Sequence, residues 1–153
     1  QAAPVIAAAA RLSSAIDKGK YAVDYICSVN TYDRKASALY EQGDMSLAAL
    51  EQDVWSSIVT KTTVCAGYAS AFQYEVGALG ILMSGGGHAW NLLELDGDYY
   101  SMGVSGIDGV NGNYVYDWFN FNRGDNLKFQ MAVELKPEES LYYPYRLSAK
   151  LPS

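Results

Sequence analysis

The chain has 153 residues, of which 50% are apolar and 18% are charged, and its formal net charge is −6. This length suits a single domain, and the apolar content is enough for a buried core. The negative charge argues against a nucleic-acid partner, because phosphate binding needs a basic surface. No apolar run reaches the roughly 18–20 residues that span a bilayer, so we expect no transmembrane segment.

The first part of the chain carries apolar residues at helical spacing, with glycine or polar breaks between the segments. The segments predict helices over about residues 5–18, 21–30, 34–42 (a short helix or a loop) and 46–58. Gly19 is expected to end the first helix. Ser46 can cap the fourth helix, which carries Trp55.

Cys65 comes just before apolar residues at helical spacing, which predict a further helix that Gly80 ends. The cysteine therefore lies in the first turn of this helix. Partial positive charge and unpaired N–H groups at a helix start favour a thiolate. Cys27 lies among apolar residues and is interpreted as a buried, inert thiol. The alternative is a disulfide between Cys27 and Cys65, which would make both thiols unavailable.

The pattern then changes to strands, beginning with a short strand over residues 81–83. His88, the one histidine of the chain, opens a strand over 88–95. Asp96-Gly97 is a two-residue hairpin signal, and it pairs this strand with a strand over 98–105. In that register Leu95 pairs with Asp98, and His88 lies opposite Ser105.

The remaining sequence predicts two more strands, over 114–121 and 127–135, after a glycine- and asparagine-rich loop. Helices followed by antiparallel strands indicate an α+β fold. We therefore predict one domain over residues 1–153. Its helical half covers about 1–80, its sheet half covers about 81–136, and an irregular tail covers 137–153.

A cysteine at a helix start and a histidine on a nearby strand form the arrangement that a thiol nucleophile and its base require. Cys65 would attack a carbonyl carbon, and His88 would accept the thiol proton and later protonate the leaving group. The alternative interpretation is a small buried cysteine and a structural histidine at a strand end.

Several short motifs occur in a fixed order around these two residues. They are Thr31-Tyr32-Asp33, Val64-Cys65-Ala66-Gly67-Tyr68-Ala69, Leu79-Gly80-Ile81, Gly87-His88-Ala89-Trp90-Asn91, Asp96-Gly97 and Tyr116-Asp117-Trp118-Phe119. This set resembles a bacterial transglutaminase-like domain, which belongs to the papain-like cysteine-enzyme superfamily. The resemblance implies helices packed on an antiparallel sheet, with the catalytic cysteine at a helix N-terminus.

The sequence departs from the family pattern at one position. The family carries an Asp fifteen residues after the histidine, and that position is Gly103 here. In the predicted hairpin, no acidic residue shares the face of His88, and a slip of one residue supplies none either. The group that orients the imidazole would then be Ser105 or Ser101, a backbone carbonyl, or Asp108 folding back from its loop.

Two tryptophans are candidates for the walls of the site. Trp55 matches the position where relatives place a donor near the oxyanion, a role that the Cys65 backbone N–H also suits. Trp90 shares the face of His88 and would wall the cleft. Core packing is the alternative for both. One histidine and two distant cysteines cannot form a structural zinc site, and we expect neither a metal nor a cofactor.

Two functions remain open from the sequence. The resemblance implies an enzyme that transfers acyl groups from protein or peptide amides, as a peptidase, an amidase or a cross-linker. The glycine at position 103 raises the alternative of an inactive fold that binds proteins or the cell wall. Relatives act on proteins or at the bacterial cell wall, so the resemblance also implies cell-wall peptide as a partner and an extracellular or cell-surface location.

Overall fold

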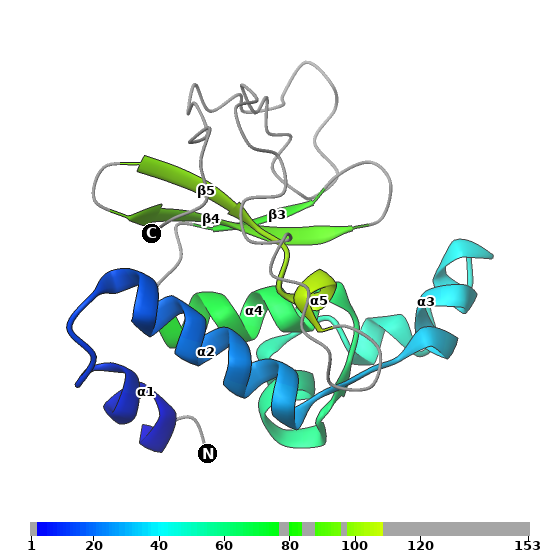
Figure 1. The fold of residues 1–153 in the computed structure, drawn as a ribbon. Coiled ribbons are helices and arrows are strands. Elements are labelled where there is room, and N and C mark those ends of the chain that lie inside the picture. Colours follow the sequence, from blue (N-terminus) through cyan, green and yellow to red (C-terminus); the bar gives the residue numbers. More distant parts are fainter. Residues whose placement is uncertain (1–2, 77–79, 84–87, 96–97, 109–153) are drawn as a thin grey trace.

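The computed structural model describes residues 3–76, 80–83, 88–95 and 98–108. The predicted strands over 114–121 and 127–135, and the tail over 137–153, lie outside the described residues. Figure 1 shows two layers, with the strands β3, β4 and β5 lying over the helices α2 and α4. This arrangement of helices on an antiparallel sheet confirms the predicted α+β class.

The N-terminal helices divide differently from the prediction. α1 covers Ala3–Ala9 and α2 covers Ala15–Val29. Ser14 caps α2, because its side chain accepts a hydrogen bond from the backbone N–H of Asp17 at 3.1 Å. The prediction that Gly19 ends a helix is wrong. Gly19 is buried inside α2, and the serine cap, which apolar spacing does not register, sets the helix start instead.

A small parallel sheet joins two distant segments. β1 (Thr31–Tyr32) pairs with β2 (Thr62–Thr63), so that Tyr32 lies opposite Thr63. Of the short helix or loop predicted over 34–42, the structure shows the helix, α3 (Arg34–Glu41). Asp33 caps it by accepting from the Ala36 N–H at 2.8 Å.

The continuous helix predicted over 46–58 is wrong. The chain forms a 3-10 turn, η1 (Ala48–Leu50), and then a π-helix, η2 (Ser56–Thr60). The Asp53 side chain accepts a hydrogen bond from the Ser56 N–H at 2.9 Å. Asp53 therefore caps a separate helical segment at a point where the predicted helix was expected to continue. Lys61, with φ of 64°, ends η2 in the left-handed conformation.

The helix at Cys65 is confirmed as α4 (Cys65–Val76). Gly80 does not end it, because Gly80 is the first residue of β3 (Gly80–Met83). β3 pairs with β4 (Ala89–Leu95) in the antiparallel sense.

The predicted hairpin forms in the predicted register, with Leu95 opposite Asp98, but it is shorter than expected. β5 covers Asp98–Met102, and the chain then enters α5 (Val104–Ile107). The prediction that Ser105 lies on the strand opposite His88 is therefore wrong. Val104 and Ile107 are fully buried in this short helix. Burial of these two apolar side chains in the core stabilises the helix more than continued strand pairing would stabilise β5.

The core lies between the helices and the sheet, and α4 is at its centre. Tyr68 and Phe72 of α4 are fully buried and pack with Val23 of α2 and Met102 of β5. The cysteine helix therefore lies at the interface of the two layers. No helix among residues 3–76 and 104–107 is long and apolar enough to cross a bilayer.

Candidate functional site

Cys65 is the first residue of α4, and its side chain is 8% exposed. Neither Cys65 nor Cys27 takes part in a disulfide, so that alternative is excluded. Cys27 is buried, and its thiol donates a weak hydrogen bond to the Val104 carbonyl over 3.7 Å. Burial raises the pKa of Cys27, with a smaller contribution from Asp108, and this fits the predicted inert thiol.

Hydrogen bonds beneath the start of α4 fix the position of the cysteine. Thr63 Oγ1 donates to the Glu51 carbonyl at 2.7 Å and lies 2.7 Å from Ser56 Oγ. The same Glu51 carbonyl accepts from the Val64 N–H at 3.2 Å. Gly67 packs on this network so closely that a Cβ there would lie 1.8 Å from Thr63 Oγ1. The glycine of the sequence motif therefore lets α4 approach the network that holds Cys65.

The strand that follows His88 is attached to the cysteine helix. Asn91 is fully buried, and its Nδ2 donates to the Ala69 carbonyl in α4 at 3.0 Å. Ala89, the residue after His88, packs in one cluster with Cys65, Ala66 and Ala69. The structure therefore brings the start of β4 against the start of α4, which are the two places where the sequence puts the histidine and the cysteine.

His88 lies one residue before β4, and its ring stacks on the ring of Trp90. The ring centroids are 5.8 Å apart, and the planes differ by 23°. Trp90 is 8% exposed, so the ring that stacks on the imidazole is buried. Burial lowers the pKa of His88, because an imidazolium loses solvation there.

Two effects shift the pKa of the Cys65 thiol in opposite directions. Burial raises its pKa, and backbone N–H groups of Ala89, Ala66 and Cys65 itself lower it by a smaller amount. The expected helix-start effect is thus present, but burial outweighs it. A raised thiol pKa and a lowered imidazole pKa together favour the neutral thiol and the neutral imidazole at pH 7.

Asp108, the predicted third member, contacts a different residue. The Tyr68 hydroxyl donates a hydrogen bond to the Asp108 carboxylate. A carboxylate beside His88 would raise the histidine pKa, whereas the shift is downward and burial is its cause. β5 holds one acidic residue, Asp98, and Asp98 pairs with Leu95 at the hairpin end. The described residues thus supply no electrostatic sign of an acid acting on His88.

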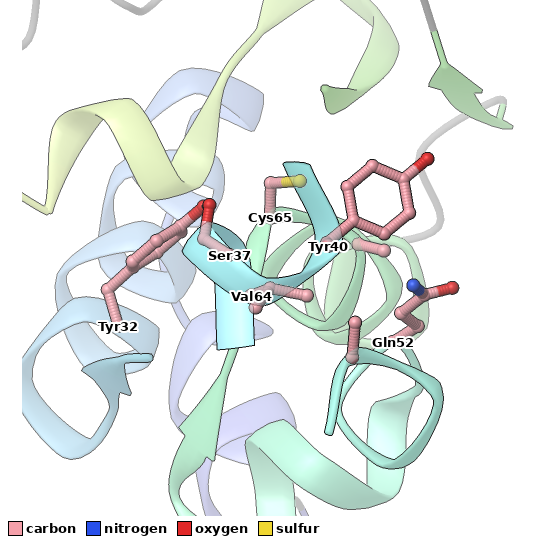
Figure 2. Close-up of a pocket in the computed structure, with 8 residues that line it drawn as sticks. Tyr32, Ser37, Tyr40, Gln52, Val64 and Cys65 are labelled. Carbon is pink, nitrogen blue, oxygen red and sulfur yellow. The ribbon is translucent and has the colours of Figure 1, made fainter. Parts of the chain in front are cut away.

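A pocket of about 30 Å³ lies beside the cysteine. Its lining residues are shown in Figure 2 and comprise Tyr32, Ser37, Tyr40, Ala48, Gln52, Val64, Cys65 and Ala66. Trp55 is not among them. Its side chain is 63% exposed at the start of η2, so it is neither the expected core residue nor part of this pocket.

Comparison with known proteins finds a similar fold among solved structures. No family model matches the chain, and no curated protein matches it in sequence. A solved structure described as "Crystal structure of a TGase" matches with a TM-score of 0.60 and 21% sequence identity. The match covers 72% of this chain and 32% of that chain, so this chain spans about a third of that protein.

The chain has a transglutaminase-like fold. This finding confirms the architecture that the sequence resemblance implies, with helices packed on an antiparallel sheet. Within the transglutaminase-like fold, the segments that follow His88 and Cys65 contact each other. Ser105 lies in α5 and Trp55 has an exposed side chain, so neither is placed where we expected it.

Sequence reasoning missed several pocket residues of this transglutaminase-like fold. Tyr32 was part of a motif but carried no predicted role, and Ser37, Tyr40 and Gln52 had no signal at all. The place of Tyr32 depends on the β1–β2 pairing, and strands of two residues have no recognisable pattern in the sequence. Among the described residues, no three His, Cys, Asp or Glu side chains gather in a group that could hold a metal ion.

Proposed function

We propose that the chain is a thiol-dependent acyl-transfer domain, in which Cys65 is the nucleophile and His88 is the general base and acid. The observation that supports this most is the attachment of β4 to α4. The Asn91–Ala69 hydrogen bond and the packing of Ala89 on Cys65 hold the residue next to the histidine against the cysteine. The transglutaminase-like fold supports the same proposal.

The reaction starts from the neutral pair that burial favours. As the Cys65 sulfur attacks an amide carbonyl carbon, His88 takes the thiol proton, and the carbonyl π electrons move onto oxygen. The C–N bond then breaks, and His88 donates the proton to the leaving amine. The product of this half-reaction is a thioester on Cys65.

The second half-reaction transfers the acyl group. Water or a primary amine loses a proton to His88 and attacks the thioester carbon, and the C–S bond breaks as His88 returns the proton to sulfur. Water gives hydrolysis, and an amine such as a lysine side chain gives a cross-link. We propose protein or peptide amides as the substrate class.

A second candidate function is a binding module that retains the fold without turnover. Gly103 in place of the family Asp favours it, as does the absence of any acidic residue but Asp98 on β5. The buried, protonated thiol also fits a domain that does not perform chemistry.

Acyl transfer can be measured with dimethylated casein and a fluorescent primary amine, and hydrolysis with unmodified casein. We expect label or fragments with the wild type and with Cys27→Ser, the matched thiol control. Cys65→Ser and His88→Ala should each lose the activity. Mass spectrometry of acid-quenched protein should show an acyl adduct on Cys65.

Activity that survives Cys65→Ser, or that disappears with Cys27→Ser in a folded protein, would contradict the proposal. An inactive wild type that binds casein as tightly as Cys65→Ser does would instead favour the binding module. Fluorescence anisotropy of labelled casein distinguishes these outcomes, because it measures binding without turnover.

A further inference from the structure

The pocket beside Cys65 is small, with a volume of about 30 Å³. A carbonyl oxygen fits such a space. The hydroxyls of Tyr32 and Ser37 lie together on one side of Cys65, and Tyr40 lies on the other (Figure 2).

Backbone pairing fixes Tyr32 close to the cysteine. Tyr32 lies opposite Thr63 in the β1–β2 ladder, and Thr63 comes two residues before Cys65. The Asp33 N–H donates to the Thr63 carbonyl at 3.0 Å, which extends this pairing by one residue. The backbone of Tyr32 is therefore tied to the segment that leads into the nucleophile.

The ring of Tyr32 is held between the cysteine cluster and a second tyrosine. It packs on the cluster that contains Cys65 and Ala89. Its centroid lies 6.1 Å from that of Tyr68, with 32° between the planes. Tyr68 is fully buried and is itself fixed by its hydrogen bond to Asp108. These contacts leave the phenol little freedom, which is what a preorganised donor requires.

The hydroxyl of Tyr32 donates only a weak hydrogen bond. The hydroxyl donates to Ser37 Oγ over 3.5 Å, which is long for an O–H···O bond. The proton can therefore turn toward a stronger acceptor at little cost. Burial raises the pKa of Tyr32 despite opposing hydrogen bonds with Ser37 and the Cys65 backbone, so the phenol keeps its proton at neutral pH.

We propose that the Tyr32 hydroxyl donates the hydrogen bond that stabilises the oxyanion formed when Cys65 attacks an amide carbonyl. This inference depends on the proposed acyl-transfer function and adds a catalytic residue to it. The tetrahedral oxygen takes its negative charge inside the pocket, where a fixed donor in low dielectric is most effective. Trp55, the residue that the sequence suggested for this role, has a largely exposed side chain outside the pocket.

The test compares Tyr32→Phe with Tyr74→Phe, which removes a hydroxyl from an exposed tyrosine of α4. Tyr32→Phe should lower kcat for casein labelling by about 10²–10³, the usual loss for one oxyanion donor, and should leave KM nearly unchanged. Tyr74→Phe should match the wild type. Installing 4-aminophenylalanine at position 32 restores an N–H donor and should recover part of the lost activity.

Two probes of Cys65 separate this role from a structural one. The peptide aldehyde acetyl-Leu-Leu-norleucinal forms a thiohemiacetal that places an oxygen in the pocket, and Tyr32→Phe should weaken its inhibition by about tenfold or more. Iodoacetamide alkylates the thiol without forming an oxyanion, so its rate with Tyr32→Phe should stay near that of the wild type. An equal loss with both probes would show that Tyr32 positions the thiol, and it would overturn the proposal.

The remaining outcomes distinguish the two proposals. An active wild type whose kcat is unchanged by Tyr32→Phe, or is lowered by Trp55→Phe instead, would overturn the oxyanion role alone. A wild type without activity, and without a Cys65 adduct from the aldehyde, would overturn both proposals. Thermal melting of each variant reports folding, and the 4-aminophenylalanine protein keeps the test decisive if Tyr32→Phe does not fold.

Discussion

The buried amide of Asn91 in β4 donates a hydrogen bond to the Ala69 carbonyl in α4, with 3.0 Å between nitrogen and oxygen. Asn91 comes three residues after His88, and Ala69 comes four residues after Cys65. One side chain thus connects the two segments that carry the proposed pair. Asparagine suits this position because its side-chain amide supplies an N–H donor, and a helix carbonyl has a second lone pair that can accept from it.

We expect Asn91→Ala to lower both stability and activity. It removes a fully buried hydrogen bond, so the free energy of unfolding should fall by about 1–3 kcal/mol. Casein labelling should fall further than the unfolded fraction explains, because β4 is no longer held against α4. Urea unfolding and the labelling assay measure the two effects.

Asn30→Ala is the control for this prediction. The Asn30 amide also donates to a backbone carbonyl, that of Ile26 at 2.9 Å, but it lies at the end of α2. Asn30→Ala should therefore lower the stability of the protein without lowering the activity of the folded fraction. If both variants reduce activity alike, the Asn91 bond has no specific role in positioning the site.

Two glycine-to-alanine substitutions should change the free energy of unfolding in opposite directions. A Cβ at Gly67 would lie 1.8 Å from Thr63 Oγ1 and 2.7 Å from Ser56 Oγ, so Gly67→Ala should destabilise the protein by about 3 kcal/mol or more. Gly19 lies inside α2, and its Cβ would lie 4.0 Å from Leu93 Cδ2, which is an ordinary contact. Gly19→Ala should therefore raise the free energy of unfolding by about 0.5–1 kcal/mol.

Thermal melting of the two variants at one pH checks the pair. A stabilising Gly67→Ala would show that the packing of α4 on the Thr63 network is looser than described. A destabilising Gly19→Ala would show that α2 does not continue through position 19, and that the predicted helix end at Gly19 was right.

The sequence predicted the parts of the fold that have strong local signals. Apolar spacing after Cys65 predicts α4, and Asp96-Gly97 predicts the hairpin register with Leu95 opposite Asp98. These features depend on residues that are close in the chain, so pattern and propensity are enough to find them.

The errors arise where distant contacts decide the local structure. Ser105 lies in α5 because Val104 and Ile107 are buried against the core, although the strand pattern continues through them. The helix expected over 46–58 is an exception, because the Asp53 cap that divides it is a local contact with Ser56. The place of Tyr32 beside Cys65 depends on a two-residue parallel ladder between segments about thirty residues apart.

Glu75 should make stability depend on pH. Its side chain is buried in the last turns of α4, and neither carboxylate oxygen has a hydrogen-bond partner among the described residues. Burial raises the pKa of Glu75 to about 7, and the charge of Lys61 opposes the shift. The folded state therefore retains a proton that the unfolded state releases above pH 4.5.

The stability that depends on this proton is complete below pH 4.5 and is lost as the pH rises to 7. Glu75→Gln should thus raise the free energy of unfolding at pH 8 by up to about 3 kcal/mol and change it little at pH 4. Glu94→Gln, at an exposed position of β4, should change it little at either pH. Urea unfolding at the two pH values measures this, and an equal gain at both would contradict the raised pKa.

Asp108 should have no effect on the pH dependence of Cys65 alkylation. Burial raises the pKa of Cys65 and lowers that of His88, so alkylation by iodoacetamide should be slow near pH 6 and increase in the alkaline range. The Asp108 carboxylate accepts from Tyr68, and no carboxylate effect raises the pKa of His88. Asp108→Asn should therefore leave this pH profile in place.

The measurement uses a Cys27→Ser background, so that only Cys65 reacts, and Asp44→Asn is the exposed control. A carboxylate that acts on a neighbour within about 4–6 Å shifts its pKa by roughly 1–3 units. If Asp108 were the third member, the wild type would react rapidly near pH 6, and Asp108→Asn would move the profile by at least about one pH unit. An unchanged profile, together with loss of labelling in His88→Ala, would mean that His88 works without a carboxylate partner at position 108.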